Sequence, residues 1–136
     1  MKVRDLMAQP VVTIDCREVL ADAIDLMRAR EIHHLVVTDN GEAIGLLSAH
    51  DVARFESKKH VAPEVVQVGE AMSPEPYRVE PDAPLAGVAA EMAACGFGAA
   101  LVVEHGRLVG VLTVRDCLRM LARLLGPVRG GDHAVA

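Results

Sequence analysis

Aromatic side chains are almost missing from this 136-residue sequence, which has no Trp, one Tyr and two Phe. Hydrophobic residues still make up 51% of the chain, so any core has to be built from aliphatic side chains and methionine. A flat ligand would therefore lie against aliphatic groups rather than stack on aromatic rings.

Cysteine pairs and excess positive charge are missing as well. Cys16, Cys95 and Cys117 are an odd number and show no CxxC spacing, so they predict neither a disulfide framework nor a zinc finger. We expect them to be small hydrophobic residues in a reducing compartment. The formal net charge of −5 argues against nucleic acid as a partner, because broad binding to phosphate backbones needs clustered Lys and Arg.

Membrane and catalytic signals are also lacking. No apolar run approaches the roughly 18 residues of a membrane helix, and the N-terminus has no apolar signal core. We therefore expect a soluble cytoplasmic protein that uses no membrane. The sequence has no P-loop, no dinucleotide glycine fingerprint and no nucleophile elbow. This favours a binding module over an enzyme, with no catalytic residues and no required cofactor.

An internal repeat organises what is present. Residues 3–54 align with residues 68–119 without a gap and share twelve identical pairs. We predict a first repeat over 1–58, a linker over 59–67, a second repeat over 68–125 and a flexible tail over 126–136. Matched repeats of this kind indicate two copies of one supersecondary unit.

Each repeat shows the pattern strand, helix, strand, strand, helix. The ranges predicted for the first are 11–15, 18–30, 35–38, 43–48 and 49–58, and a matching set follows in the second, where Asp82 is expected to cap the first helix. A unit of about 50 residues is too small to bury much surface alone. We therefore expect an α+β fold in which two β-α-β-β-α repeats pack sheet to sheet with pseudo-twofold symmetry. The cleft between the repeats is the natural place for a ligand.

One motif stands at the strand-to-helix junction of both repeats. It runs from Gly45 through Ser48 to Asp51, and again from Gly110 through Thr113 to Asp116. A hydroxyl residue three positions before a carboxylate fits the cap of a helix, which needs no ligand. The same junction can also point backbone amides, a hydroxyl and a carboxylate into one small space that holds a ligand. The motif alone allows both interpretations.

Together these motifs resemble a known family. The segments Val3–Met7 and Val68–Met72, the run His33–Val37 and the duplicated motif are similar to a pair of cystathionine β-synthase (CBS) domains, also called a Bateman module. The resemblance implies clefts that bind adenosyl compounds such as AMP, ADP, ATP or S-adenosylmethionine as regulatory ligands, and a homodimer that regulates an unidentified effector protein. The ligand-binding residues carried over are Thr13, Ile14, His33, His34, Gly45, Ser48, His50, Asp51, Arg78, Val79, Gly110, Thr113, Arg115 and Asp116.

The two repeats differ at positions near the expected ligand. Thr13 aligns with Arg78, and His33-His34 align with Gly98-Ala99, so we expect the two clefts to differ in affinity. A nucleotide-free dimeric scaffold is the alternative function, with Leu118, Leu121 and Leu125 as the dimer surface. Metal binding through His33, His34 and His50 is a weaker alternative, because adjacent histidines on a strand point to opposite faces and no metal-ligand spacing is present.

Overall fold

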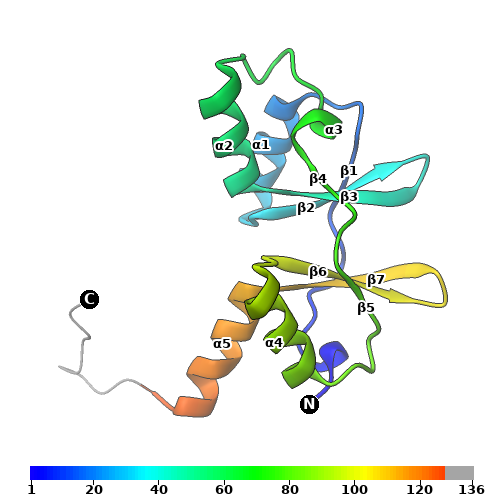
Figure 1. The fold of residues 1–136 in the computed structure, drawn as a ribbon, viewed down its shortest axis with the longest axis vertical. Helices are drawn as coiled ribbons and strands as arrows, with labels where there is room; N and C mark the ends of the chain where they lie inside the picture. The colour runs from blue at the N-terminus through cyan, green and yellow to red at the C-terminus, as the bar shows by residue number, and fades with distance from the viewer. Residues whose placement is uncertain (128–136) are drawn as a thin grey trace.

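The computed structural model describes residues 1–127 as two lobes whose sheets face each other, with the longer helices on the outer sides (Figure 1). The expected α+β architecture of two repeats packed sheet to sheet is confirmed. The elements are η1 (Val3–Asp5), β1 (Thr13–Asp15), α1 (Leu20–Arg30), β2 (His34–Asp39), β3 (Glu42–Ser48), α2 (Ala49–Lys59), α3 (Val68–Ala71), β4 (Ser73–Pro74), β5 (Arg78–Val79), α4 (Leu85–Cys95), β6 (Ala99–Glu104), β7 (Arg107–Thr113) and α5 (Val114–Leu125). Of the tail predicted over 126–136, residues 128–136 lie outside the part of the chain that the structure describes.

The two sheets share an arrangement of three strands, and the first sheet has a fourth strand because β4 pairs antiparallel with β3. In the first, β1 pairs with β2 in parallel and β2 with β3 antiparallel; in the second, β5, β6 and β7 repeat this order. Both hairpins turn on two residues with positive φ, Asn40 and Gly41 at 51° and 83°, and His105 and Gly106 at 51° and 76°. Such dihedrals suit a tight turn between twisted strands. An Asn-Gly pair between two strands is typical of such a turn.

Aliphatic side chains fill the space between the sheets, as the scarcity of aromatic residues requires. Val36, Leu46, Ala99 and Leu101 are buried there. Each lobe has its own core on the other face of its sheet, where helices cover buried residues such as Leu20 and Met92. None of the helices within residues 1–127 is long and apolar enough to cross a bilayer.

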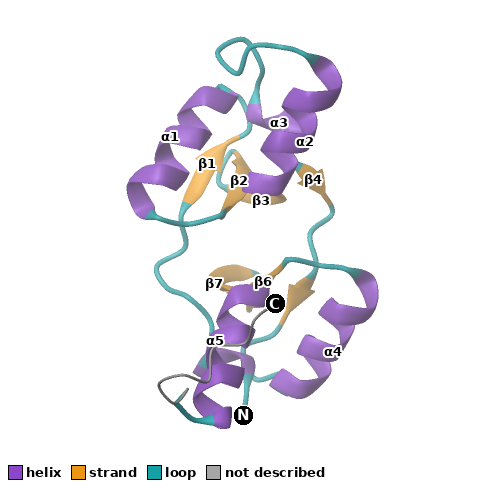
Figure 2. Ribbon diagram, turned by 90° about the vertical axis from the view of Figure 1, so that its left-hand side faces the viewer, coloured by secondary structure: helices purple, strands orange, loops and turns teal. Residues whose placement is uncertain are grey.

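Each lobe borrows its entry segment from the other repeat. The N-terminal residues of the chain pack on the second lobe, where the Val3 amide donates to the Ala83 carbonyl at 3.0 Å and Ala8 bridges to Val111. In return, α3 and β4 pack on the first lobe, where the Val68 amide donates to the Glu18 carbonyl at 2.8 Å. The chain therefore crosses between the lobes twice, on opposite sides (Figure 2).

Two expectations about local structure are corrected by these contacts. Asp82 does not cap α4, whose N-cap is Pro84 without a side-chain bond. The Asp82 carboxylate instead accepts a hydrogen bond from Arg4 Nε at 2.7 Å. This bond ties the N-terminal segment to the second lobe. The first strand is also shorter than predicted, since only Thr13–Asp15 pairs with β2. Within the segment predicted as a linker, Val66 is buried and accepts a bond from the Leu20 amide at 2.7 Å.

Two glycines let the borrowed segments lie close to the sheets. A Cβ at Gly45 would stand 2.6 Å from Met72 Sδ and 2.8 Å from the Ser73 carbonyl oxygen, and a Cβ at Gly110 would stand 2.7 Å from Met7 Sδ. Atoms at such distances overlap, so neither position tolerates a side chain without movement.

The contact distances predict unequal costs for the two glycines. Gly45→Ala should lower the free energy of unfolding by about 1–3 kcal/mol, because its new methyl group meets a backbone oxygen as well as Met72. Gly110→Ala should cost less, because its nearest neighbours are all atoms of the Met7 side chain. Urea denaturation of both variants measures the difference.

Gly87→Ala is the matched control for both substitutions. Gly87 lies in α4 with nothing within 4 Å of its ideal Cβ, so alanine should stabilise the protein by about 0.5–1 kcal/mol. Equal losses at Gly45 and Gly110, or a loss at Gly87, would contradict this account of segment docking.

Candidate functional site

Both copies of the duplicated motif form a capping box. Ser48 Oγ accepts from the Asp51 amide at 2.9 Å, and Asp51 Oδ2 accepts from the Ser48 amide at 3.0 Å. Thr113 and Asp116 repeat the pair at 3.2 and 2.9 Å. The motif therefore starts α2 and α5, and the same bonds hold each carboxylate in one orientation.

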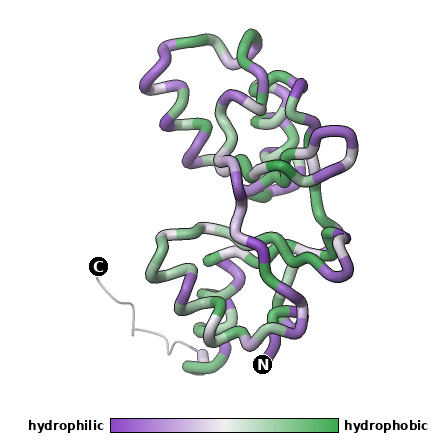
Figure 3. Tube along the Cα trace, turned by 45° about the vertical axis from the view of Figure 1, so that its right-hand side comes forward, coloured by the Kyte–Doolittle hydropathy of each residue, from purple (hydrophilic) through white to green (hydrophobic). Residues whose placement is uncertain are grey.

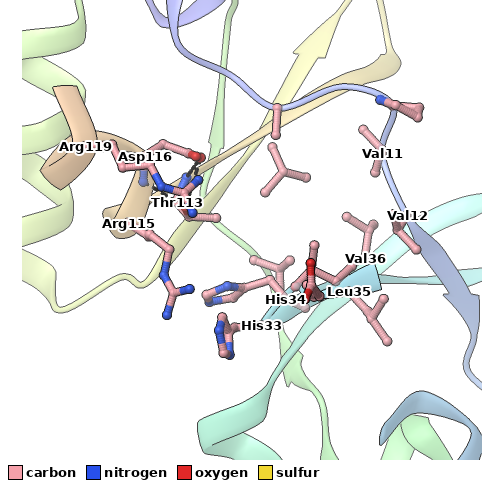
Figure 4. Close-up of a pocket in the computed structure, with 16 residues that line it drawn as sticks. Val11, Val12, His33, His34, Leu35, Val36, Thr113, Arg115, Asp116 and Arg119 are labelled. Atoms are coloured by element: carbon pink, nitrogen blue, oxygen red, sulfur yellow. Dashed lines mark hydrogen bonds between the residues drawn. The ribbon is translucent and has the colours of Figure 1, made fainter. Parts of the chain in front are cut away.

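Each carboxylate faces a cleft whose opposite wall belongs to the other lobe. We call these the Asp116 cleft and the Asp51 cleft, with volumes of about 260 and 770 Å³. The Asp116 cleft (Figure 4) is lined by Ala8, Pro10, Val11, Val12, Glu31, Ile32, His33, His34, Leu35, Val36, Leu46, Val111, Thr113, Arg115, Asp116 and Arg119. The Asp51 cleft is lined by His33, His34, Leu46, Ser48, Ala49, His50, Asp51, Arg54, Ser73, Pro74, Glu75, Pro76, Tyr77, Gly96, Phe97, Gly98 and Ala99. Most residues that line one cleft align in the repeat with residues that line the other.

The two carboxylates differ in how many partners they have. Asp51 is only 8% exposed; its Oδ1 accepts from Arg54 Nη2 at 2.7 Å, and Ser73 Oγ donates to it from the borrowed segment at 3.4–3.5 Å. Asp116 is half-buried, and within residues 1–127 its Oδ1 accepts no hydrogen bond. The repeat equivalent of Ser73 is Ala8, which has no hydroxyl to offer. Asp116 therefore keeps one carboxylate oxygen for a ligand.

His33 and His34 line both clefts. The expectation that they point to opposite faces is wrong, because β2 begins only at His34 and both rings lie beside Arg115 (Figure 4). His34 Nε2 lies 3.3 Å from the ideal Cβ position of Gly98, so the ring occupies space that a side chain there would need. Residues 1–127 contain no group of three or more His, Cys, Asp or Glu placed to hold a metal ion.

Six of the predicted site residues lie in neither cleft. Ile14 and Val79 are buried in the cores of the two lobes. Thr13 and Arg78 line a third hollow near the hairpin turns, where Arg78 Nη2 donates to the Ala43 carbonyl at 2.9 Å.

Gly45 and Gly110 line neither cleft; they lie under the borrowed segments. The structure does bring His33, His34, Thr113, Arg115 and Asp116 together in one cleft, and Ser48, His50 and Asp51 in the other.

The crossing segments supply the wall residues that sequence reasoning missed. Val11 and Val12 line the Asp116 cleft, and Pro76 and Tyr77 line the Asp51 cleft. These wall residues come just before the short strands β1 and β5, which contain the predicted residues Thr13, Ile14, Arg78 and Val79. Tyr77 stacks on Phe97 with ring centroids 5.0 Å apart, so two of the chain's three aromatic residues lie at the Asp51 cleft.

A fourth hollow, of about 540 Å³, lies between α4 and α5 and is lined almost entirely by apolar residues. Leu118, Leu121 and Leu124 of α5 are 59%, 49% and 70% exposed. Exposed leucines in a continuous row are typical of a protein contact surface.

The environment of His34 predicts a pH-dependent stability. Burial lowers the pKa of His34 below 6.5, and neighbouring His33 and Arg115 lower it further, while Asp51 and Asp116 raise it. The unfolded chain therefore binds a proton at higher pH than the folded protein does. Stability should be greatest above about pH 6.5 and fall as the pH drops through the folded pKa.

Urea denaturation between pH 8 and pH 5 tests this for His34→Gln against the unsubstituted protein. The variant should lose less stability over that range, because it has no ring to protonate. Parallel curves for the two proteins would contradict the assignment.

Comparisons with known proteins agree with this architecture. The family model for the CBS domain matches residues 3–58 and again residues 68–123. A CBS domain-containing protein from Dictyostelium discoideum is 29% identical over 138 residues, which cover 93% of this chain and 94% of that protein. The chain spans less than half of the other curated relatives, including 24% and 23% of two archaeal L-aspartate semialdehyde sulfurtransferases.

Solved structures show the same fold. A CBS-domain protein from Burkholderia ambifaria matches with a TM-score of 0.87 at 22% identity, covering 94% of this chain and 98% of that one. The CBS domain pair of protein MJ0100, solved in complex with 5′-methylthioadenosine and S-adenosyl-L-methionine, matches with a TM-score of 0.80 at 23% identity over 89% of this chain and 95% of that one. With two matched domains and their paired sheets, this chain belongs to the CBS-domain family.

Proposed function

We propose that this protein is a regulatory module that binds one adenosyl compound per chain, in the Asp116 cleft. The observation that carries the proposal is that Asp116 Oδ1 accepts no hydrogen bond from residues 1–127, in a cleft whose other wall comes from the opposite lobe and is partly apolar. A carboxylate held in place by a capping box can accept from both hydroxyls of a ribose. Charge-assisted bonds of this kind are the stronger class of hydrogen bond.

The apolar part of this wall suits the adenine base of such a ligand. Val11, Val12 and Ile32 line it, and aliphatic side chains can cover both faces of an adenine without aromatic stacking. The protein MJ0100 pair, whose fold is the same, holds two adenosyl compounds, which supports this ligand class here.

The Asp51 cleft is the weaker site in this proposal. Arg54 and Ser73 already occupy the Asp51 carboxylate, so a ribose would have to displace them. Ribose hydroxyls are neutral, so the Asp51 carboxylate would exchange the charged Arg54 for an uncharged partner, which gains little free energy. We propose that this cleft stays empty at ligand concentrations that fill the Asp116 cleft.

Binding rather than catalysis is the proposed role. In the Asp116 cleft, the side-chain hydrogen bond of Thr113 goes to Asp116 at 2.9 Å, and no histidine bonds to that hydroxyl within the described residues. The sulfurtransferase relatives match this chain over about a quarter of their length, so the match concerns a module of those enzymes. We also propose that an effector protein responds to the bound ligand.

The exposed face of α4 and α5 favours a second copy of this chain as a partner. In repeat alignment, Leu118, Leu121 and Leu124 stand where α2 has Ala53, Glu56 and Lys59, so only the second lobe carries this apolar row. The helices of that lobe also include longer hydrophobic stretches in Figure 3. No residue of α5 is buried.

The neighbouring face of α4 is made of small residues, among them Ala86, Ala90 and Ala93, all exposed. Leucines of one copy can pack on alanines of the other across a twofold axis, and the reverse contact follows by symmetry. We propose a homodimer built on the second lobes. A dimer with empty clefts, acting as a scaffold, is the second candidate function.

Calorimetric titration with AMP, ATP and S-adenosylmethionine tests the ligand site. Asp116→Asn should weaken binding of whichever ligand binds by about ten- to a hundredfold, because the ribose hydroxyls lose a charged acceptor. Asp51→Asn is the matched control and should leave the affinity unchanged while lowering stability. A stronger effect of Asp51→Asn would assign the ligand to the Asp51 cleft. If no adenosyl compound binds, the ligand site is contradicted and the scaffold is the remaining candidate function.

Sedimentation velocity tests the dimer surface. The double substitution Leu118→Gln with Leu121→Gln should convert a dimer into a monomer, because the buried apolar row becomes polar. The control pair, Ala53→Gln with Glu56→Gln at the equivalent positions of α2, should remain a dimer. Dissociation of the control, or a dimer that survives the leucine substitutions, would contradict the assignment.

A further inference from the structure

Four basic side chains gather at the Asp116 cleft. Arg115 and Arg119 come from α5 of the second lobe, while His33 and His34 come from the first. Figure 4 shows the Arg115 side chain directed toward the two imidazole rings. The acidic residues that line the same cleft are Asp116 and Glu31.

The two arginines form no ion pair with any residue in the described part of the chain. Their repeat equivalents behave differently. Arg54, which corresponds to Arg119, pairs with Asp51 at 2.7 Å, and the position of Arg115 is taken by His50. The positive charge of the Asp116 cleft is thus available to a ligand, whereas the arginine of the Asp51 cleft is already neutralised.

His34 responds to the charge of whatever lies beside it. The groups that act on it are Asp51 from α2, Arg115 and Asp116 from α5, and the adjacent His33. Burial is the largest cause of the lowered pKa of His34 and favours the uncharged ring. A phosphate would favour protonation of the ring and could accept a bond from it.

We propose that the Asp116 cleft selects adenosyl ligands that carry phosphate on the 5′ carbon over the uncharged 5′-methylthioadenosine and the cationic S-adenosylmethionine. This inference rests on the function proposed above and specifies its ligand class. Arg115 is the principal selecting residue, since it lies between Asp116 and the two histidines. Charge-assisted bonds from its guanidinium favour the phosphate, and the same charge repels a sulfonium.

Calorimetric titration with AMP and 5′-methylthioadenosine tests the selection, because both compounds carry the same adenine and ribose. AMP should bind at least about tenfold more tightly. Arg115→Gln should remove most of that preference by weakening AMP and leaving 5′-methylthioadenosine unchanged. Arg123→Gln is the control: it removes the same charge from α5 at an exposed position that lines neither cleft, and the preference should persist.

The outcomes separate this inference from the proposed function. Equal or tighter binding of 5′-methylthioadenosine or S-adenosylmethionine would overturn the phosphate selection and leave the adenosyl site standing. Failure of every adenosyl compound to bind would overturn the proposed function and this inference with it. A preference for AMP that survives Arg115→Gln, or that Arg123→Gln also removes, would overturn the assignment to Arg115.

Discussion

The docking of each entry segment on the opposite lobe is the contact on which the rest of the structure depends. Val3 and Val68 are both fully buried, each in the core of the lobe that its own repeat does not build. Gly45 and Gly110 leave room for the methionines that follow these valines. Neither repeat completes its core alone, which agrees with the small size of each unit. The exchange also carries the chain past both clefts, so the crossing segments become cleft walls.

The same motif caps a helix in both lobes, and we propose a ligand-binding role for it in only one. As a helix cap, the hydroxyl and carboxylate are used alike in α2 and α5. As a ligand site, they differ because Asp51 has Arg54 and Ser73 while Asp116 has an alanine in place of the serine and an arginine that does not reach it. Duplication thus yields two similar clefts, and a few substitutions around each carboxylate leave Asp116 with fewer hydrogen-bond partners than Asp51 among the described residues.

The positions of helices and strands were largely predictable, because the repeat shows each pattern twice and local periodicity dominates them. The elements that were missed are η1, α3 and β4, which have three, four and two residues. Segments this short form through contacts with the other lobe, so their own sequences carry little signal. The family resemblance, not a local pattern, led to the expectation that Thr13, Ile14, Arg78 and Val79 line the clefts. The wall lies a few residues earlier in the chain, where the segments cross.

The sequence by itself determined the duplicated unit, the hairpin turns, the paired carboxylates and the inequality of the two repeats, because all of these depend on residue types at local spacings. Tertiary structure decided which lobe receives each entry segment, which residues line each cleft, and that one histidine pair serves both. These properties depend on contacts such as Met72 against Gly45 and His34 against Gly98, which join residues far apart in the chain. No local pattern encodes such distances, because packing of the two sheets sets them.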